Sequence, residues 1–281
     1  MANTQELTEE EKELLKGSCH GGGGLPPKLE PMEGSSVKHV IGVVSGKGGV
    51  GKSLVTSLLA SEMQKRGYKV AILDADVTGP SIPRAFGVTD GLTGQGDSII
   101  PSETESGIKM VSVNLMLPQD DMPVAWRGPV VSSAIQQFFS QVQWGDIDYM
   151  FVDMPPGTSD VALTVFQSLP LDGIITVSAP QELVAMIVGK AVNLARKMDV
   201  KVLGLVENMA YFMCPSCKEK HFIYGKPQGG EVAKRYNIPA YATLPIDPDF
   251  ASKVDEGKIE MYEINEALNE IIEQIKKIEK N

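Results

Sequence analysis

Continuous runs of apolar residues recur from residue 37 onward and predict buried strands. Runs such as IGVV, YMFV and GIITV lack the alternation of a strand with one solvated face, and this is typical of parallel strands covered on both faces. Strands are expected at 39–44, 69–73, 109–113, 149–152, 173–177, 201–206 and 240–243, and helices at 53–65, 129–143, 182–198 and 229–236. This alternation predicts an α/β fold, a parallel sheet covered by helices, in which ligands bind beyond the carboxyl ends of the strands.

The two ends of the chain depart from this pattern. Residues 1–36 include a stretch rich in Gly and Pro without apolar periodicity, so we expect a flexible N-terminal extension before a single domain over 37–281. Near the C-terminus, isoleucines and leucines recur at helical spacing from Ile264 to Ile278. Glutamates line the polar side, whereas a membrane-surface helix prefers Lys and Arg. We therefore expect this helix to pack on the sheet.

Composition and charge exclude several classes of function. The 281 residues carry a formal net charge of −10, which is unfavourable for binding a phosphate backbone, so nucleic acid is not expected as a partner. The longest apolar runs fall well short of the roughly 20 residues of a membrane span, and the acidic N-terminus is unlike a signal peptide. The three cysteines, Cys19, Cys214 and Cys217, are too few for a disulfide framework and indicate the reducing cytoplasm.

A phosphate-binding loop follows the first strand and precedes the first helix. The sequence G-x-x-x-x-G-K-S occupies positions 46–53 between that strand and that helix, the context that gives the motif its specificity. Its nucleotide-binding residues are Gly46, Lys47, Gly48, Gly49, Val50, Gly51, Lys52 and Ser53. The glycines let successive N–H groups point at one phosphate. Lys52 is expected to reach the outer phosphates of ATP, and the Ser53 hydroxyl to ligate Mg²⁺.

Two acidic loops are expected at the same edge of the sheet. Asp76 follows the second strand and is placed to orient the attacking water, as a catalytic residue. Asp153 closes the apolar run YMFV, the Walker B arrangement in which a carboxylate lies near Mg²⁺. Gly157 can offer its N–H to the γ-phosphate, in a loop of the kind that changes shape on hydrolysis. We expect Asp160 to cap the following helix.

The pair Cys214 and Cys217 forms a C-x-x-C motif that several kinds of site would fit. A thioredoxin-like redox pair should open a helix, and the proline after the first cysteine fits this poorly. A zinc site needs four ligands, of which His221 is a candidate third. Two buried thiols paired by chance are disfavoured by the polar residues around them. Alternatively, two subunits each supply two thiolates to one iron–sulfur cluster, since such clusters take four.

Several motifs resemble known families. The loop KGGVGKS resembles the "deviant Walker A" group of P-loop ATPases, although Leu54 replaces the usual threonine. Together with DADVTGPS, WRGP, DMPPGTSD, APQE, GLVENMAYFMCPSC and LPIDP, it resembles the Mrp/ApbC family of iron–sulfur cluster carrier ATPases, related to the MinD and ParA proteins. The likeness covers nearly all of 37–281, in order.

The resemblance implies a homodimer that hydrolyses ATP, receives a 4Fe-4S cluster from a donor and passes it to apo iron–sulfur proteins. Cys214 and Cys217 of each subunit would hold the cluster at the dimer interface. Lys47 would act as a catalytic residue on the nucleotide of the partner subunit, in the manner of an arginine finger. Asn208 would recognise adenine, with Pro245 and Asp247 on the same side.

Two alternatives stay open. The first is a MinD- or ParA-like positioning ATPase, which would leave the cysteine pair unexplained. The second is a zinc-bridged dimeric ATPase with the same cysteine ligands. Cys19 is a candidate for handing a cluster over, and no role is assigned to Trp126 or Arg127.

Overall fold

The structure is a computed structural model of the chain. It describes residues 27–76, 81–95, 98–116, 128–157, 159–180, 184–264 and 266–278. Residues 1–26 of the expected N-terminal extension, including Cys19, lie outside these ranges, as do Trp126 and Arg127.

Nine of the described strands form one sheet, in the order β10-β9-β8-β1-β7-β2-β6-β5, with β11 also paired to β9. The strands of this sheet are β1 (Ser36–Ser45), β2 (Val70–Asp74), β5 (Ser102–Glu103), β6 (Lys109–Ser112), β7 (Asp146–Asp153), β8 (Gly173–Ser178), β9 (Val202–Met213), β10 (Lys220–His221) and β11 (Tyr241–Ile246). The pairings of β5 with β6 and of β10 with β9 are antiparallel, and the others are parallel. A separate hairpin joins β3 (Thr93–Gln95) and β4 (Ser98–Ile100). The predicted α/β fold with a mostly parallel sheet is confirmed.

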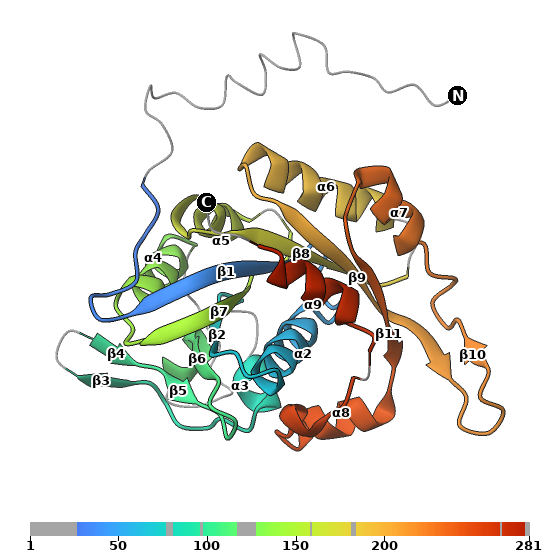
Figure 1. The fold of residues 1–281 in the computed structure, drawn as a ribbon, viewed down its shortest axis with the longest axis horizontal. Coiled ribbons are helices and arrows are strands. Elements are labelled where there is room, and N and C mark those ends of the chain that lie inside the picture. Colours follow the sequence, from blue (N-terminus) through green and yellow to red (C-terminus); the bar gives the residue numbers. More distant parts are fainter. Residues whose placement is uncertain are drawn as a thin grey trace, which may run out of the picture.

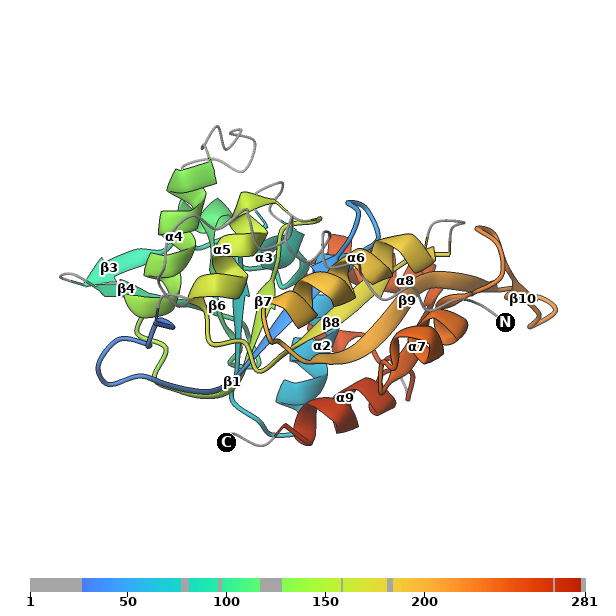
Figure 2. The ribbon, with the colours of Figure 1, turned by 90° about the horizontal axis from the view of Figure 1, so that it is seen from above.

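Helices cover both faces of the sheet (Figure 1). One face carries α4 (Gly128–Ser140), α5 (Asp160–Ser168), α6 (Val184–Lys197) and α7 (Gly229–Tyr236), which lie one after another in the view from above (Figure 2). The opposite face carries α2 (Lys52–Lys65), α3 (Ser81–Ala85), α8 (Pro248–Asp255) and α9 (Asn269–Lys276). The short 3-10 turns are η1 (Val113–Met116) and η2 (Ile259–Met261).

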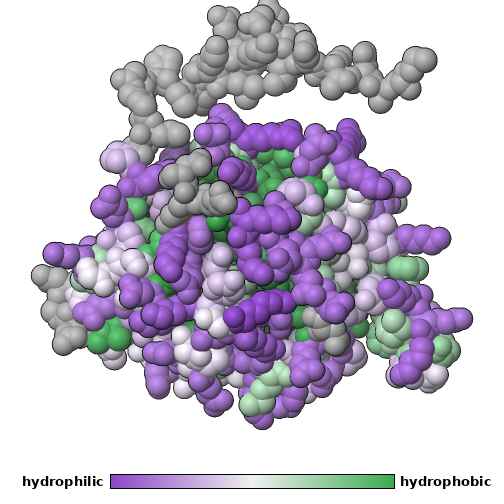
Figure 3. Space-filling model, viewed as in Figure 1, coloured by the Kyte–Doolittle hydropathy of each residue, from purple (hydrophilic) through white to green (hydrophobic). Residues whose placement is uncertain are grey.

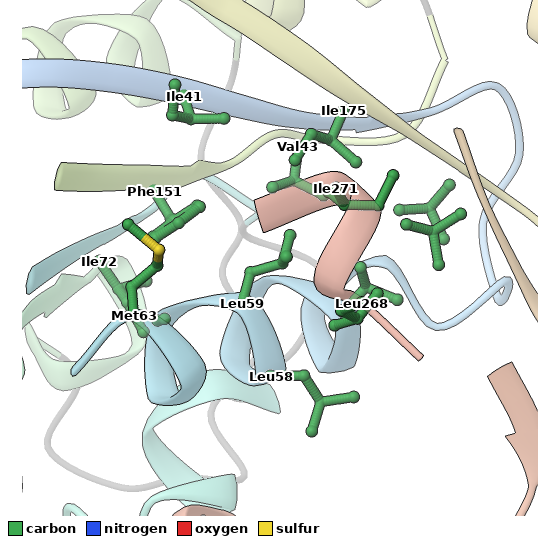
Figure 4. Close-up of a cluster of buried hydrophobic side chains, with 14 of the residues drawn as sticks. Ile41, Val43, Leu58, Leu59, Met63, Ile72, Phe151, Ile175, Leu268 and Ile271 are labelled. Carbon is green, nitrogen blue, oxygen red and sulfur yellow. The ribbon is translucent and has the colours of Figure 1, made fainter. Parts of the chain in front are cut away.

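The core consists of one apolar layer on each face of the sheet. Alternate residues of β1 supply both layers: Ile41 and Val43 face α2, whereas Val40 and Val44 belong to the layer under α4 and α5. In the first layer, Leu59 and Met63 of α2 meet residues of the central strands (Figure 4). Ile271 of α9 closes this layer. The apolar side of the C-terminal helix is therefore buried against the sheet, as its glutamate-rich polar side predicted.

The seven expected strands are all present, although β1 and β7 begin three residues earlier than predicted and β11 ends three residues later. Two further boundaries also differ from the prediction. The helix predicted over 129–143 ends at Ser140. Beyond it, the Ile99 N–H donates to the Gln141 carbonyl and the Gln143 N–H donates to the Ile99 carbonyl, each at 2.9 Å, so that Val142 forms a β-bridge with Ile99 instead of continuing the helix. The strand predicted over 201–206 continues to Met213 as β9. The short elements β3, β4, β5, β10, α3 and α8 carry too little periodicity to have been expected.

The extension of β9 contains an irregularity. Thr243 and Pro245 of β11 are two residues apart, yet they pair with Glu207 and Tyr211, which are four apart. The two extra residues of β9 form a bulge in which Met209 has φ 55°. This is a left-handed backbone conformation that residues other than Gly, Asn and Asp seldom adopt. This bulge lies where β9 passes the phosphate loop.

Candidate functional site

The phosphate loop connects the carboxyl end of β1 to the start of α2 at Lys52. Gly49 and Gly51 have φ of 79° and 80°, a conformation that is open to glycine without a steric penalty. A Cβ atom on Gly51 would lie 2.2 Å from Asn208 Nδ2, so this position also lacks room for a side chain. The glycine spacing that predicted the loop is thus required by its backbone and by its contact with β9.

Lys52 is held between two carboxylates at the floor of the loop. Its Nζ lies 2.8 Å from Asp153 Oδ1 and 3.2 Å from Asp76 Oδ2, and the side chain is 5% exposed. Burial opposes the charge of the ammonium, but the Asp153 and Asp76 carboxylates outweigh it and raise the pKa of Lys52. The lysine is therefore a fixed cation directed at the pocket, which suits it to bind phosphate oxygens.

Asp153 is fully buried and anchors the start of α2. Ser53 Oγ donates to Asp153 Oδ2 at 2.5 Å, and Thr56 Oγ1 donates to Oδ1 at 2.8 Å. Burial raises the pKa of this carboxyl, although its bonds to Lys52, Ser53 and Thr56 act in the opposite direction. A serine hydroxyl beside a carboxylate is a set of hard oxygen donors, which fits Mg²⁺. Thr56, one turn after Ser53, is a partner that the motif did not reveal.

Asp74 is a second buried carboxyl that the sequence reasoning did not assign. It is paired in register with Asp153 on the neighbouring strand. It accepts bonds from Ser112 Oγ at 2.7 Å and from the Asp76 backbone N–H at 3.1 Å. Asp74 thereby fixes the backbone that carries Asp76. Burial, followed by the charge of Asp153, raises the pKa of Asp74 to about 8.

This raised pKa predicts how the stability of the nucleotide-free protein depends on pH. Between about pH 4 and about pH 8, Asp74 keeps its proton in the folded chain but loses it in the unfolded one. The free energy of unfolding therefore falls as the pH rises through this range. We expect Asp74→Asn to reduce the fall in the free energy of unfolding between these limits. Urea unfolding at several pH values measures it, with exposed Asp160→Asn as the control. Equal slopes for wild type and Asp74→Asn would contradict this expectation.

A cavity of about 530 Å³ opens over these groups. Its lining includes the loop glycines, Lys52, Ser53 and Asp76, together with Arg84 of α3 and Met209 of the β9 bulge. Asn208 is buried beside it, and its Nδ2 donates to the Val50 carbonyl at 3.0 Å. The structure thus brings the predicted phosphate, magnesium and water-orienting residues together at one edge of the sheet. Arg84 and Met209 were not expected there.

Other predicted site residues have different surroundings. Lys47 is exposed at the rim of the loop, where its carbonyl accepts the Ser45 hydroxyl at 2.9 Å. The Gly157 N–H donates to the Ser45 carbonyl at 2.8 Å, so a bond to a γ-phosphate requires that contact to break. Asp160 does not cap α5. Ser159 does, because its hydroxyl accepts the Ala162 N–H at 3.3 Å.

Asp247 likewise has a local role. Its Oδ1 accepts the Asp249 N–H at 2.9 Å and caps α8. Its Oδ2 accepts the Tyr262 hydroxyl at 2.7 Å.

The cysteine pair lies in the turn between β9 and β10, which projects from the body of the protein (Figure 3). Cys217 is exposed and Cys214 partly so. The backbone N–H groups of Cys217 and Ser216 donate to Cys214 Sγ and lower the pKa of this thiol. The thiolate form is the one that binds metals. Exposed apolar residues flank the pair in the sequence, namely Met213, Phe222, Ile223 and Tyr224.

Comparison with known proteins gives concordant results. A ParA family model described as NUBPL iron-transfer P-loop NTPase matches residues 36–280. The chain is 44% identical over 264 residues to an iron-sulfur cluster carrier protein of Clostridium perfringens, covering 91% of this chain and 92% of that relative.

Two solved structures are also similar. A nucleotide-binding protein of Archaeoglobus fulgidus in complex with ADP has a TM-score of 0.73 and 42% identity, covering 81% of this chain and 89% of that one. The cell division ATPase MinD of Pyrococcus furiosus has a TM-score of 0.62 at 20% identity, covering 86% and 99%. At that identity the likeness concerns the fold alone.

Within the described ranges, the helices are too short or too polar to cross a bilayer.

Proposed function

The chain belongs to the NUBPL-type iron-transfer P-loop NTPases, and from this premise we propose that it hydrolyses ATP and carries a 4Fe-4S cluster to apo-proteins. The observation that carries the proposal is the course of β9. This strand places Asn208 on the phosphate loop and Met209 in the nucleotide pocket, and it ends beside Cys214. Nucleotide and cargo would therefore bind at two points of the same strand.

In the pocket, each polar group has one role. The loop N–H groups and Lys52 bind the phosphates of ATP, and Ser53 and Asp153 hold Mg²⁺. Asp76 orients the attacking water, since it lies at the open side of Lys52 at 13% exposure. Lys47 acts on the nucleotide of the partner subunit, which its exposed position permits.

Two further residues complete the nucleotide site. Asn208 contacts adenine, either through its Nδ2, which must then leave the Val50 carbonyl, or through its Oδ1. Gly157 exchanges the Ser45 carbonyl for the γ-phosphate. Nucleotide binding would therefore break the bond between Gly157 and Ser45, and also that between Asn208 and Val50 where the Asn208 Nδ2 binds the base.

At the hairpin, two subunits share one cluster. A 4Fe-4S cluster takes four thiolates, and this turn supplies Cys214 and Cys217. The exposed apolar side chains beside them offer area for a subunit contact. The cluster is cargo, received from a donor and released to apo iron–sulfur proteins, and this exchange takes place in the reducing cytoplasm, where cysteine thiols stay reduced.

Anaerobic reconstitution with iron and sulfide tests the proposal. We expect the absorbance of a 4Fe-4S cluster, one cluster per two subunits and the mass of a dimer. The same preparation should hydrolyse ATP with Mg²⁺. A reconstituted protein that holds zinc but no iron and sulfide would favour a zinc-bridged dimeric ATPase.

The structure disfavours a positioning ATPase that binds membranes through its C-terminal helix. Ile271, Ile272 and Ile275 of α9 are each at most 1% exposed. A helix that binds a membrane surface needs its apolar side free to enter the bilayer. Releasing α9 would open the core layer that also contains Leu59 and Met63.

The roles of Asp76 and Asp153 predict two different defects. Asp153→Asn removes a full charge beside Ser53 and Lys52, so we expect Mg²⁺–ATP binding to weaken by at least about tenfold. Asp76→Asn keeps the loop and the metal ligands, so it should bind ATP and hydrolyse it about 10² to 10⁴ times more slowly. Titration with labelled nucleotide and single-turnover hydrolysis separate the two effects.

Asp148→Asn is the control for this pair, because Asp148 lies on the same strand as Asp153 but binds Lys38 at the other end of it. It should leave both binding and hydrolysis unchanged. Equal binding defects in Asp76→Asn and Asp153→Asn would defeat the assignment of separate roles.

A further inference from the structure

The cysteine turn is folded within a single chain. Lys220 and His221 of β10 pair with Met213 and Phe212 of β9. The Cys214 N–H donates to the Glu219 carbonyl at 3.0 Å, and the Lys218 N–H donates to the Cys214 carbonyl at 2.9 Å. Lys218 adopts φ 60° to close the turn. Two strands and two backbone bonds therefore fix the path of residues 214–221 without a partner subunit.

This path brings three metal-binding side chains together. The ligand atoms of Cys214, Cys217 and His221 all lie within 4.8 Å of one another. In a tetrahedral site with bonds of about 2.0 to 2.3 Å, ligand atoms lie roughly 3.3 to 3.8 Å apart. Closing the difference needs about 1 Å of movement, which side-chain rotation supplies. Cys217 and His221 are exposed, so an ion can enter from solvent.

The backbone around the first cysteine also suits a bound ion. The N–H groups of Cys217 and Ser216 point at Cys214 Sγ. Such bonds orient a thiolate and balance part of its charge, the function of outer groups around a metal. Two thiolates and one imidazole form a donor set for a divalent ion of intermediate softness, such as Zn²⁺ or Fe²⁺.

We propose that a single subunit binds one Zn²⁺ or Fe²⁺ ion through Cys214, Cys217 and His221, with the fourth position left to water. The site shares two thiols with the 4Fe-4S cluster proposed above but does not depend on it, because its third ligand comes from the same hairpin. The hairpin then has two mutually exclusive loads, a single ion in the monomer and a shared cluster in the dimer. His221 belongs only to the first.

Co²⁺ tests the site, because its tetrahedral thiolate complexes absorb in the visible and near ultraviolet. We expect anaerobic titration of the full chain to give one Co²⁺ per subunit, thiolate-to-cobalt charge transfer and a monomeric native mass. Zn²⁺ should displace the cobalt. His221→Ala should weaken Co²⁺ binding by at least about tenfold, and His221→Cys should restore it with stronger charge transfer.

Glu219→Gln is the matched control, since the Glu219 carboxylate lies 3.9 Å from Cys217 Sγ and could otherwise serve as a metal ligand. It should bind Co²⁺ as wild type does. The proposal is overturned if Co²⁺ binds once per two subunits at dimeric mass, if His221→Ala titrates like wild type, or if Glu219→Gln loses binding instead.

Cluster reconstitution distinguishes this inference from the proposed function. We expect His221→Ala to assemble the 4Fe-4S cluster normally while its Co²⁺ affinity falls. Failure of both wild type and His221→Ala to assemble a cluster would count against the carrier function and leave the cobalt result to decide the single-ion site.

Discussion

Replacing Lys47 with alanine is expected to slow ATP hydrolysis by about 10³-fold or more while most of the ATP binding remains. The two lysines of the loop have different environments, and this is the physical reason. Lys52 is buried between Asp76 and Asp153, whereas Lys47 is exposed at the rim. Lys52→Ala should therefore abolish productive phosphate binding. Lys47→Ala should remove only a charge that acts in the transition state from the partner subunit.

Two measurements test this assignment. Nucleotide affinity and single-turnover hydrolysis are compared for wild type, Lys47→Ala, Lys52→Ala and Lys197→Ala, an exposed lysine at the end of α6 that should behave as wild type. Activity per subunit of wild type should rise as the protein passes from monomer to dimer, and that of Lys47→Ala should not. Hydrolysis by Lys47→Ala at the wild-type rate would show that the two-lysine interpretation is wrong.

The central strands were predictable because burial on both faces is visible in composition. Ile41 and Val43 face one apolar layer while Val40 and Val44 face the other, so the whole run has to be apolar. The short elements at the edges were not predictable. Strand β10 has only two residues, and its position depends on pairing with β9 rather than on its own pattern.

The phosphate loop was predictable for a similar reason, since its glycines are required by positive φ and by the contact of Gly51 with Asn208. The surrounding network was not. Thr56 binds Asp153 from one turn into α2, and a threonine inside a helix carries no sequence signal of such a role. Asp74 was visible as a charge at the end of an apolar strand, but only the register with Asp153 shows that two carboxyls lie side by side.

The bulge in β9 could not be derived from the sequence either, because it is a property of the pairing with β11. The bulge lies within β9, and the length of this strand is what connects the nucleotide pocket to the cysteine hairpin. Non-glycine residues in a left-handed conformation persist where surrounding contacts hold them, often at functional sites. Met209 is such a residue, and it lines the pocket.

The second large effect is expected at the hairpin. Cys214→Ala or Cys217→Ala should each abolish binding of the 4Fe-4S cluster, because each removes two of the four thiolates from a symmetric dimer. ATP binding should persist in both, since the phosphate loop connects β1 to α2, whereas the turn at 214–219 connects β9 to β10. Iron and sulfide content, absorbance and nucleotide titration measure the two properties on the same preparation.

The controls decide whether the cluster is shared between subunits. Ser216→Ala lies between the two thiols and offers only its backbone N–H to Cys214, so it should keep the cluster. Cys19→Ala and His221→Ala should keep it too. The loaded protein should be a dimer and should return toward monomer when the iron is chelated, unless nucleotide holds the subunits together. A monomer with a full cluster, or a Cys19→Ala protein without one, would instead place Cys19 in a site built within one chain.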